Sequence, residues 1–308
     1  MSVRFELCDA HTVQRYAEAL LDLERAITYP LGDGRERFFI DHGEDYHRFF
    51  STMGDAYFLV ALDGSNVVGV VVGVLKRAVH EGRAWQSAYV CDLKLAPSHR
   101  GSGVAAALLR EALSISARRS ALRRWRFAYG AAMRGERGDV MRSASGPLHP
   151  ATLAGPWATL RLWFVEPSRL ASLDPRACPS NPESLFDLSP AARLHGAIDG
   201  ELGLVSTAGR KDLRLVSSGA PWPLVHVATS PSSYRSTLGE HLRAVGRALV
   251  ARDENALVCW AIDDRLRAHW SWLEGRGLRS DTVCTVYGLS LPTGPSREPL
   301  VHLSTSEI

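Results

Sequence analysis

The stretch Asp92-Leu-Lys-Leu-Ala-Pro-Ser-His-Arg-Gly-Ser-Gly-Val-Ala-Ala-Ala-Leu-Leu-Arg110 decides the fold of this chain. Its first four residues alternate between polar and apolar side chains, which is the period of a β-strand. Pro97 ends that strand because proline has no N–H to donate to a neighbouring strand. Gly101 and Gly103 predict a tight turn, and the apolar spacing from Val104 onward predicts a helix.

A glycine turn that leads into a helix exposes unpaired backbone N–H groups at the positive end of the helix dipole. The turn therefore predicts a site for a phosphate or pyrophosphate group. It is neither a dinucleotide fingerprint nor a P-loop, because it has no third spaced glycine and no Gly-Lys followed by Ser or Thr.

Residues 100–105, Arg-Gly-Ser-Gly-Val-Ala, fit the pattern R-x-x-G-x-A after a strand and a proline. This arrangement resembles the acyl-CoA-binding motif of the GNAT superfamily of N-acyltransferases. The resemblance implies an acyl-CoA cofactor, acetyl-CoA in the simplest case, held by the strand, the turn and the start of the helix. The cofactor-binding residues that it implies are Leu93, Lys94, Leu95, Arg100, Gly101, Ser102, Gly103, Val104 and Ala105.

The composition is that of an ordinary globular protein, with 308 residues, 45% hydrophobic residues and 22% charged residues. This length allows one large or two medium domains. A net charge of +3 is too small to imply a nucleic-acid partner, and the longest apolar run, residues 67–75, is too short to span a membrane. No signal peptide is evident, and five scattered cysteines show no metal-ligand spacing. We therefore expect a reduced cytoplasmic protein without a metal, and the oligomeric state is left open.

Periodicity predicts the order β-α-α-β-β-β-α-β in the first half, which is also the order of the GNAT fold. Residues 57–62 and 67–75 read as a hairpin around Asp63-Gly-Ser-Asn66. Residues 12–27 read as a helix and residues 29–43 as a loop with a short helix.

The second half repeats part of this order. A strand at residues 223–228 precedes a helix at 238–252, a strand at 256–262, a helix within 263–278 and a closing strand at 282–291. We expect an α/β (α+β) fold in which a mixed, mostly antiparallel sheet is flanked by helices, in two tandem GNAT-like copies. The expected domains are residues 1–167, which bind the cofactor and catalyse, and residues 168–308, which lack the glycine pair and are degenerate. A single enlarged domain, or an unrelated second domain, is the alternative.

Two residues are candidates for catalysis under the GNAT resemblance. Asp92, on the strand before the turn, is the candidate base that removes a proton from an amine, provided that burial raises its low intrinsic pKa. The general-acid tyrosine of the family has no counterpart in residues 135–143, and Tyr129, at the end of the preceding strand, is a possible substitute.

The predicted function is transfer of an acyl group, acetyl in the first instance, from acyl-CoA to a primary amine on a small molecule or peptide. Two alternatives stay open: a CoA-binding regulatory protein without turnover, and an acyltransferase for longer or carrier-bound acyl groups. The acceptor is expected to contact the mixed-charge loop at residues 29–46.

Overall fold

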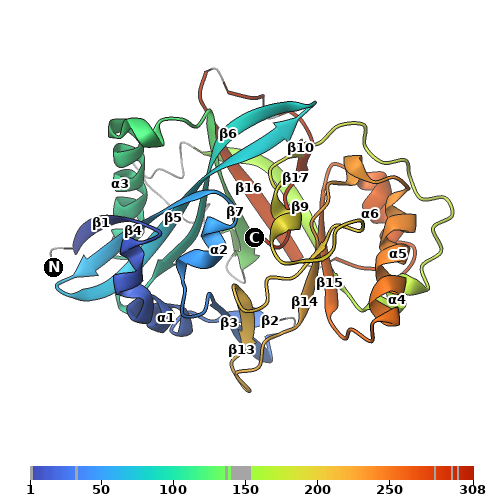
Figure 1. Cartoon of the computed structure of the whole chain (residues 1–308), viewed down its shortest axis with the longest axis horizontal. Helices are drawn as coiled ribbons and strands as arrows, with labels where there is room; N and C mark the ends of the chain where they lie inside the picture. Colours follow the sequence, from blue (N-terminus) through green and yellow to red (C-terminus); the bar gives the residue numbers. More distant parts are fainter. Residues whose placement is uncertain are drawn as a thin grey trace.

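The computed structural model describes residues 3–31, 34–135, 138–139, 154–280, 282–292, 294–296 and 298–308. It shows a long twisted sheet with helices packed on both faces (Figure 1). The elements of the first half are β1 (Val3–Asp9), α1 (Ala17–Arg25), β2 (Tyr29–Leu31), β3 (Glu36–Asp41), α2 (His47–Ser51), β4 (Asp55–Asp63), β5 (Asn66–His80), β6 (Arg83–Leu95), α3 (Val104–Arg118), β7 (Phe127–Gly135), β8 (Gly138–Asp139) and β9 (Gly155–Val165).

The second half contains fewer long strands and more connecting segments. Its elements are α4 (Pro167–Ala171), β10 (Phe186–Asp187), β11 (Ala197–Asp199), β12 (Leu204–Val205), β13 (Asp212–Leu215), β14 (Leu224–Val227), α5 (Leu238–Ala251), β15 (Leu257–Asp263), α6 (Arg267–Glu274), β16 (Thr282–Ser290) and β17 (Val301–His302).

The two halves share one sheet, and they exchange strands at its centre. The strand order is β1-β4-β5-β6-β7-β16-β9-β15-β14-β12-β11. β16, near the end of the chain, pairs with β7 of the first half, whereas β9 of the first half pairs with β15 of the second. β16 and β9 also pair with each other. The expected division at residue 167 stays a prediction, and the sheet is continuous across it, because β7 and β9 pair with strands that follow residue 167.

The predicted internal repeat is visible in the backbone. In each half a strand leads through a 3₁₀ turn into a helix, and the next strand is parallel to the first: β6, α3, β7 and β14, α5, β15. The turns are Pro97–His99 and Pro231–Ser233. The residues that follow them, Arg100 and Tyr234, have φ/ψ of −68°/141° and −68°/139°. Together with the mixed sheet, this confirms the predicted α/β fold in two GNAT-like copies.

The core is divided by the sheet. One face carries α3, whose Val104 and Leu108 pack on Leu59, Ala61 and Val71. The other face carries α1 and α2, whose buried residues include Leu20, Leu23, Phe49 and Phe50. In the second half α5 packs on α4, where a Cβ on Gly246 would lie only 2.3 Å from the backbone nitrogen of Ala171. Residues 301–307 are buried, so the last segment of the chain forms part of the core.

The region predicted as a loop at residues 29–43 is instead a pair of strands, so that prediction is wrong. β2 and β3 form a hairpin, and β13 of the second half adds to β3 to make a three-stranded sheet. Arg214 on β13 fixes this pairing with an ion pair of 2.5 Å to Asp41. These strands escape a local analysis because they are short and their partner lies about 170 residues away in sequence. Residues 12–27 form a 3₁₀ turn followed by α1 rather than one helix.

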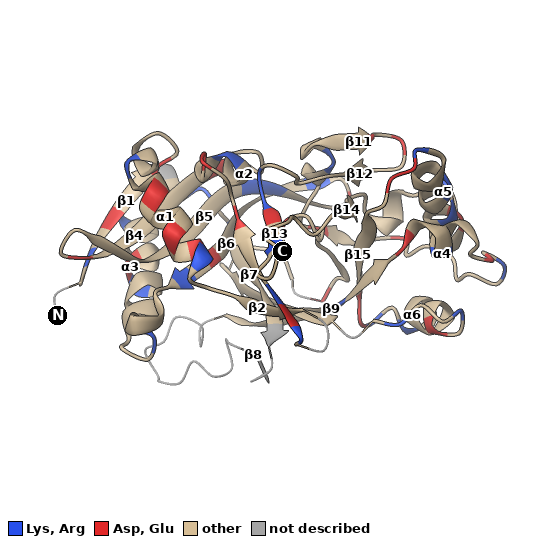
Figure 2. Ribbon diagram, turned by 90° about the horizontal axis from the view of Figure 1, so that it is seen from below, with Lys and Arg blue, Asp and Glu red and all other residues tan. Residues whose placement is uncertain are grey.

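Figure 2 shows Lys and Arg positions interspersed with Asp and Glu positions along the described part of the ribbon. Among the described helices, none combines the length and the apolar character that crossing a membrane requires.

Candidate acyl-CoA and acceptor site

The turn before α3 has the backbone that anion binding requires. Gly101 and Gly103 adopt φ of +75° and +84°, the left-handed region that favours glycine. A Cβ at either position would meet no atom within 4 Å, so the surface of the turn is open. No side chain among the described residues caps α3, and its first N–H groups face this space. The residues therefore fit a pyrophosphate group at the helix N-terminus.

β6 parts from β7 beside this turn. The two strands pair only at Ser87–Phe127, Ala88–Ala128 and Tyr89–Tyr129, and then diverge. Opposite β5, Asp92 and Leu93 form a β-bulge, because Val70 pairs with Lys94 and Val72 with Cys91. Asp92 has a φ of +50°, which is strained for a residue other than glycine. The bulge and the divergence leave main-chain groups of β6 free to contact a ligand between the strands.

The predicted cofactor residues lie on several sides of this opening. Leu93 lines the cavity described below and is 38% exposed. The side chain of Lys94 is buried in contact with Glu24 of α1, and Lys94 also lines the cavity. Leu95 packs under α3, and Val104, the first residue of α3, is buried in the same cluster. Ser102 donates from its hydroxyl to the carbonyl of His99 within the turn.

A cavity of about 1630 Å³ runs from the opening between β6 and β7 to the second half. It reaches along α3, past Asp92 and Cys91, and under the sheet formed by β2, β3 and β13. This volume exceeds the 300–1,000 Å³ of common ligand pockets, as expected of a site for two ligands. Its position between two structural repeats is also a common one for ligand pockets.

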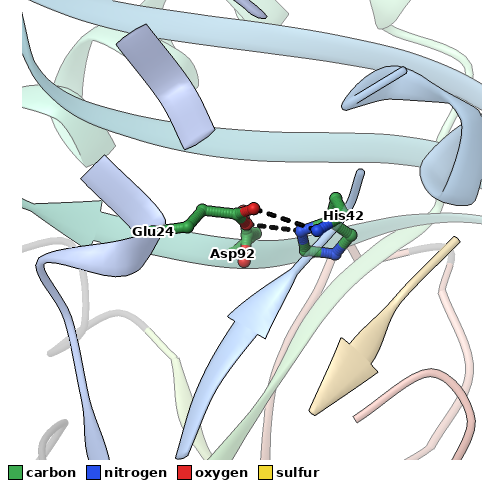
Figure 3. Close-up of side chains that lie close together, drawn as sticks. All are labelled: Glu24, His42 and Asp92. Carbon is green, nitrogen blue, oxygen red and sulfur yellow. Dashed lines mark hydrogen bonds and ion pairs between the residues drawn. The ribbon is translucent and has the colours of Figure 1, made fainter. Parts of the chain in front are cut away.

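A buried polar cluster borders this cavity, and its members His42, Asp92 and Lys94 line it. The Asp92 carboxylate accepts a hydrogen bond from the Tyr46 hydroxyl and lies 2.5 Å from Lys94 Nζ. Lys94 Nζ also lies 2.5 Å from Glu24 Oε1, and Glu24 in turn holds both the backbone N–H and the imidazole of His42. Figure 3 shows Glu24 reaching from α1 to His42, with Asp92 beside them.

Glu24, His42 and Asp92 also have the donor types of a metal site, with ligand atoms within 4.8 Å of one another. Lys94 Nζ, however, contacts both carboxylates. The positive charge between them is thus supplied by the protein, and these residues do not fit a metal ion without displacement of Lys94.

The pKa of Asp92 follows from this cluster. Burial alone would raise it, but the charge of Lys94 and the hydrogen bonds from Lys94 and Tyr46 outweigh burial and hold the pKa below its usual value. Conversely, the two carboxylates raise the pKa of Lys94 despite its burial. Burial thus does not raise the Asp92 pKa as a strong base would need, and its role as a base stays a prediction.

Tyr129 lies in the core at the base of the opening. Its ring stacks on Tyr89, with 4.8 Å between centroids, and its hydroxyl donates to the carbonyl of Leu188 at 3.1 Å. Burial, followed by Glu307, raises its pKa. The proton of Tyr129 is therefore directed to the protein backbone, a geometry that favours packing over proton transfer. Most of residues 135–143, where the sequence lacks the family's tyrosine, lies outside the described residues.

Lys211 is a site residue that the sequence does not reveal. It reaches the cavity from the turn before β13, where its Nζ lies 5.0 Å from the centre of the Phe49 ring and donates to the carbonyl of Ile308. Burial lowers the pKa of Lys211 to about 8. Glu24 does have a sequence signal, because it lies four residues after buried Leu20 on the apolar side of α1.

The equivalent helix start in the second half is closed. Thr237 caps α5, and Glu240 returns its carboxylate to the Thr237 N–H, which is a complete capping box. The Asn181 amide bonds the Ser236 carbonyl, and a Cβ on Gly239 would lie 2.6 Å from Trp272. The protein's own carboxylate thus occupies the end of α5 that corresponds to the open end of α3.

Comparison with known proteins agrees with this geometry. The model of the acetyltransferase (GNAT) family matches residues 18–132, which include the turn and α3. No curated protein matches the sequence significantly.

Solved structures show the fold over the whole chain. A tandem GNAT protein from the clavulanic acid biosynthesis pathway has a TM-score of 0.52 at 15% identity, over 96% of this chain and 100% of that one. A putative acetyltransferase from Pyrococcus horikoshii has 0.51 at 10% identity, over 99% and 95%. N-myristoyltransferase from Saccharomyces cerevisiae, solved with myristoyl-CoA, has 0.52 at 10% identity, over 97% and 85%.

At these identities the likeness shows the fold alone, and the family model covers only the first half of the chain. Residues 18–132 therefore match the GNAT acetyltransferase family, and the chain as a whole has a tandem GNAT fold.

Proposed function

We propose that this protein transfers an acyl group, acetyl in the first instance, from acyl-CoA bound in the first half to a primary amine in the adjoining cavity. The observation that carries the proposal is the uncapped N-terminus of α3 beside the divergence of β6 and β7, with the cavity beyond it. Acyl-CoA supplies the acyl group and a thiolate leaving group.

The chain's own residues have three tasks in this proposal. The N–H groups at the start of α3 hold the pyrophosphate, and the main chain of β6 orients the thioester. A group in the cavity receives the proton that the amine must lose before its nitrogen bonds to the acyl carbon. As the carbon–sulfur bond breaks, a proton from solvent neutralises the leaving thiolate, because Tyr129 is engaged with Leu188.

Two of the described groups that line the cavity are our candidates to receive the proton. Asp92 stands at the opening, but its lowered pKa makes it a weak base. Lys211 lies in the same cavity, and its pKa of about 8 lies close to the working pH, which suits a proton acceptor. We keep Asp92 as the candidate that the family resemblance implies, and Lys211 as the candidate that the structure adds.

Replacing Asp92 with asparagine should lower kcat by about 10²- to 10⁴-fold if Asp92 is the base. The loss should then shrink as the pH rises, because the amine increasingly deprotonates by itself. Steady-state rates of thiol release across pH 6–10 measure this. A loss of equal size at every pH would assign Asp92 a structural role, in fixing Lys94 and the bulge.

Replacing Lys211 with methionine tests the second candidate base through the pH dependence of kcat/KM. Below pH 8 Lys211 is protonated and cannot accept a proton, so kcat/KM of the natural protein should rise as the pH passes through about 8. The inflection should be absent from the Lys211→Met profile if Lys211 is the base. An unchanged inflection would remove Lys211 from the mechanism.

Calorimetric titration with acetyl-CoA should give one site per chain. The start of α3 is open, whereas the capping box of Thr237 and Glu240 closes the start of α5. Two equivalent sites would contradict the degeneracy proposed for the second half.

Binding by calorimetry and turnover by thiol release together separate the competing functions. Thiol release with any of a panel of amines supports an enzyme, whereas acetyl-CoA binding without thiol release would favour a CoA-binding regulator. Comparison of acetyl-CoA with longer acyl-CoA donors decides the acyl length.

A further inference from the structure

One wall of the cavity is a continuous run of aromatic rings. Tyr29 stacks on Phe38, with 5.5 Å between centroids, and Phe38 lies 6.5 Å from Trp222. Trp222 in turn stacks on Phe164 at 5.6 Å with 20° between the ring planes. All four line the cavity and are half-buried, so the run presents ring surface to whatever the cavity holds.

Both halves build this wall. Tyr29 and Phe38 come from β2 and β3, Phe164 from β9, and Trp222 from the segment before β14. The backbone N–H of Trp222 donates to the carbonyl of Leu213 on β13, which pairs with β3. Main-chain hydrogen bonds thus hold the backbone that carries the rings on each side, so the wall is preorganised for a ligand.

The aromatic run begins at the polar cluster. After burial, the main influences on the Tyr29 pKa are the charges of Lys94 and Asp92, which places Tyr29 close to both. At the far end the cavity is lined by the exposed residues Pro221, Pro223, Asn255 and Arg279, so it opens to solvent there. A ligand that lies along the rings would have one end at Asp92 and the other toward this mouth.

The charged groups that line the cavity fall into two sets. Lys211, Asp92, Lys94 and Glu307 lie together at the inner end, and Asp253, Glu254 and Arg279 lie at the mouth. Asp212 also lines the cavity, but Arg214 pairs with it at 3.2 Å. The stretch between Tyr29 and Phe164 is apolar, so it favours a ligand with an uncharged body.

We propose that the acceptor is a primary amine with an aromatic body, which stacks along Phe38 and Trp222 and directs its amine toward Asp92. This inference rests on the proposed function and narrows it to a class of acceptor. We assign the wall to the acceptor rather than to the donor's nucleotide end, because Tyr29 and Phe164 pack against the core on the face of the sheet opposite α3. The mouth near Pro223 gives the acceptor its own entrance while acyl-CoA fills the opening between β6 and β7.

Trp222→Ala in the full chain tests this assignment with two amines, 2-phenylethylamine and ethylamine, and acetyl-CoA as donor. The natural protein should prefer 2-phenylethylamine in kcat/KM. Loss of one stacked ring should weaken that preference about tenfold or more, with little change for ethylamine. The matched control is Trp270→Ala, since Trp270 packs on Arg161 outside the cavity and should leave both amines unaffected. Trp222→Leu serves if the alanine variant does not give a cooperative thermal melt.

Different measurements test the aromatic wall and the proposed function. Ligand-observed NMR of 2-phenylethylamine with each variant measures the aromatic contact without turnover, so the inference is tested even if no acetyl transfer occurs. If the natural protein neither binds acetyl-CoA nor turns it over, the proposed function is wrong, but the assignment of the aromatic wall is not affected. Equal use of both amines, or equal binding to the natural protein and Trp222→Ala, would overturn the inference.

A second donor, octanoyl-CoA, tests whether the wall holds the acyl chain instead of the acceptor. If octanoyl-CoA is used better than acetyl-CoA with ethylamine, and Trp222→Ala removes that advantage, the wall holds the acyl chain and the proposal for the acceptor is wrong.

Discussion

Gly103→Glu should abolish acyl-CoA binding while the chain remains folded. Gly103 stands at the N-terminus of α3 with φ of +84° and open space where a Cβ would lie. A glutamate there brings its carboxylate to the place of the pyrophosphate, and like charges 4 Å apart near a protein surface cost about 4 kcal/mol, or nearly a thousandfold in Kd. Calorimetry with acetyl-CoA measures this loss.

Folding should survive this change, because a non-glycine residue in the left-handed region costs about 1–2 kcal/mol against a typical total stability of 5–15 kcal/mol. The matched control is Gly82→Glu, at the tip of the β5–β6 hairpin. Gly82 also has a positive φ, +74°, and open space around it, but it lies far along β6 from the cofactor turn. Near-natural affinity in a folded Gly103→Glu protein would refute the assignment of the turn.

A chain that ends at residue 167 should fail to fold. It would lose β16, the partner of β7, and both neighbours of β9, which are β15 and β16. Buried side chains such as Leu160, Leu162 and Trp163 would then face water. Each such side chain contributes about 1.5–3 kcal/mol when buried, so a few of them equal the whole stability of a domain. The unpaired strand edges would also promote aggregation.

Expression of the fragment, followed by sedimentation and thermal melting, checks this expectation. Co-expression of residues 168–308 is the control, because it restores the missing strands and should recover folded protein. A fragment of residues 1–167 that melts cooperatively and binds acetyl-CoA alone would show that the strand exchange is dispensable.

Local patterns in the sequence were sufficient to predict the glycine turn before α3 and the main helices and strands. The apolar period of α3, the glycine pair and the hairpin of β4 and β5 are set by neighbours in sequence. The repeat in the second half was predicted for the same reason, since a 3₁₀ turn and a helix follow a strand in both halves. The capping box on α5 is also visible as Thr237 followed three residues later by Glu240.

Contacts between distant segments could not be predicted in this way. Residues 29–43 have the local pattern of a loop, because the third strand of their sheet, β13, comes from the second half. The strand Gly155–Val165 has no sequence prediction, and its neighbours β15 and β16 pair with it across 93–103 and 120–133 residues. Trp222 and Lys211 have no local signal, because their roles depend on which cavity they line.

By itself the sequence determined the resemblance to the GNAT family, the glycine turn before α3 and the order of the principal strands and helices, because hydrophobic periodicity, glycine and proline act on near neighbours. Only the tertiary structure decided the exchange of β9 and β16, the ionisation of Asp92 and the aromatic wall. Strand pairing, the pKa of a buried group and the shape of a cavity all depend on which distant residues come together. Asp92 shows the difference: its place on the strand and its neighbour Lys94 are written in residues 92–95, but the burial and the hydrogen bond from Tyr46, which also act on its pKa, exist only in the folded core.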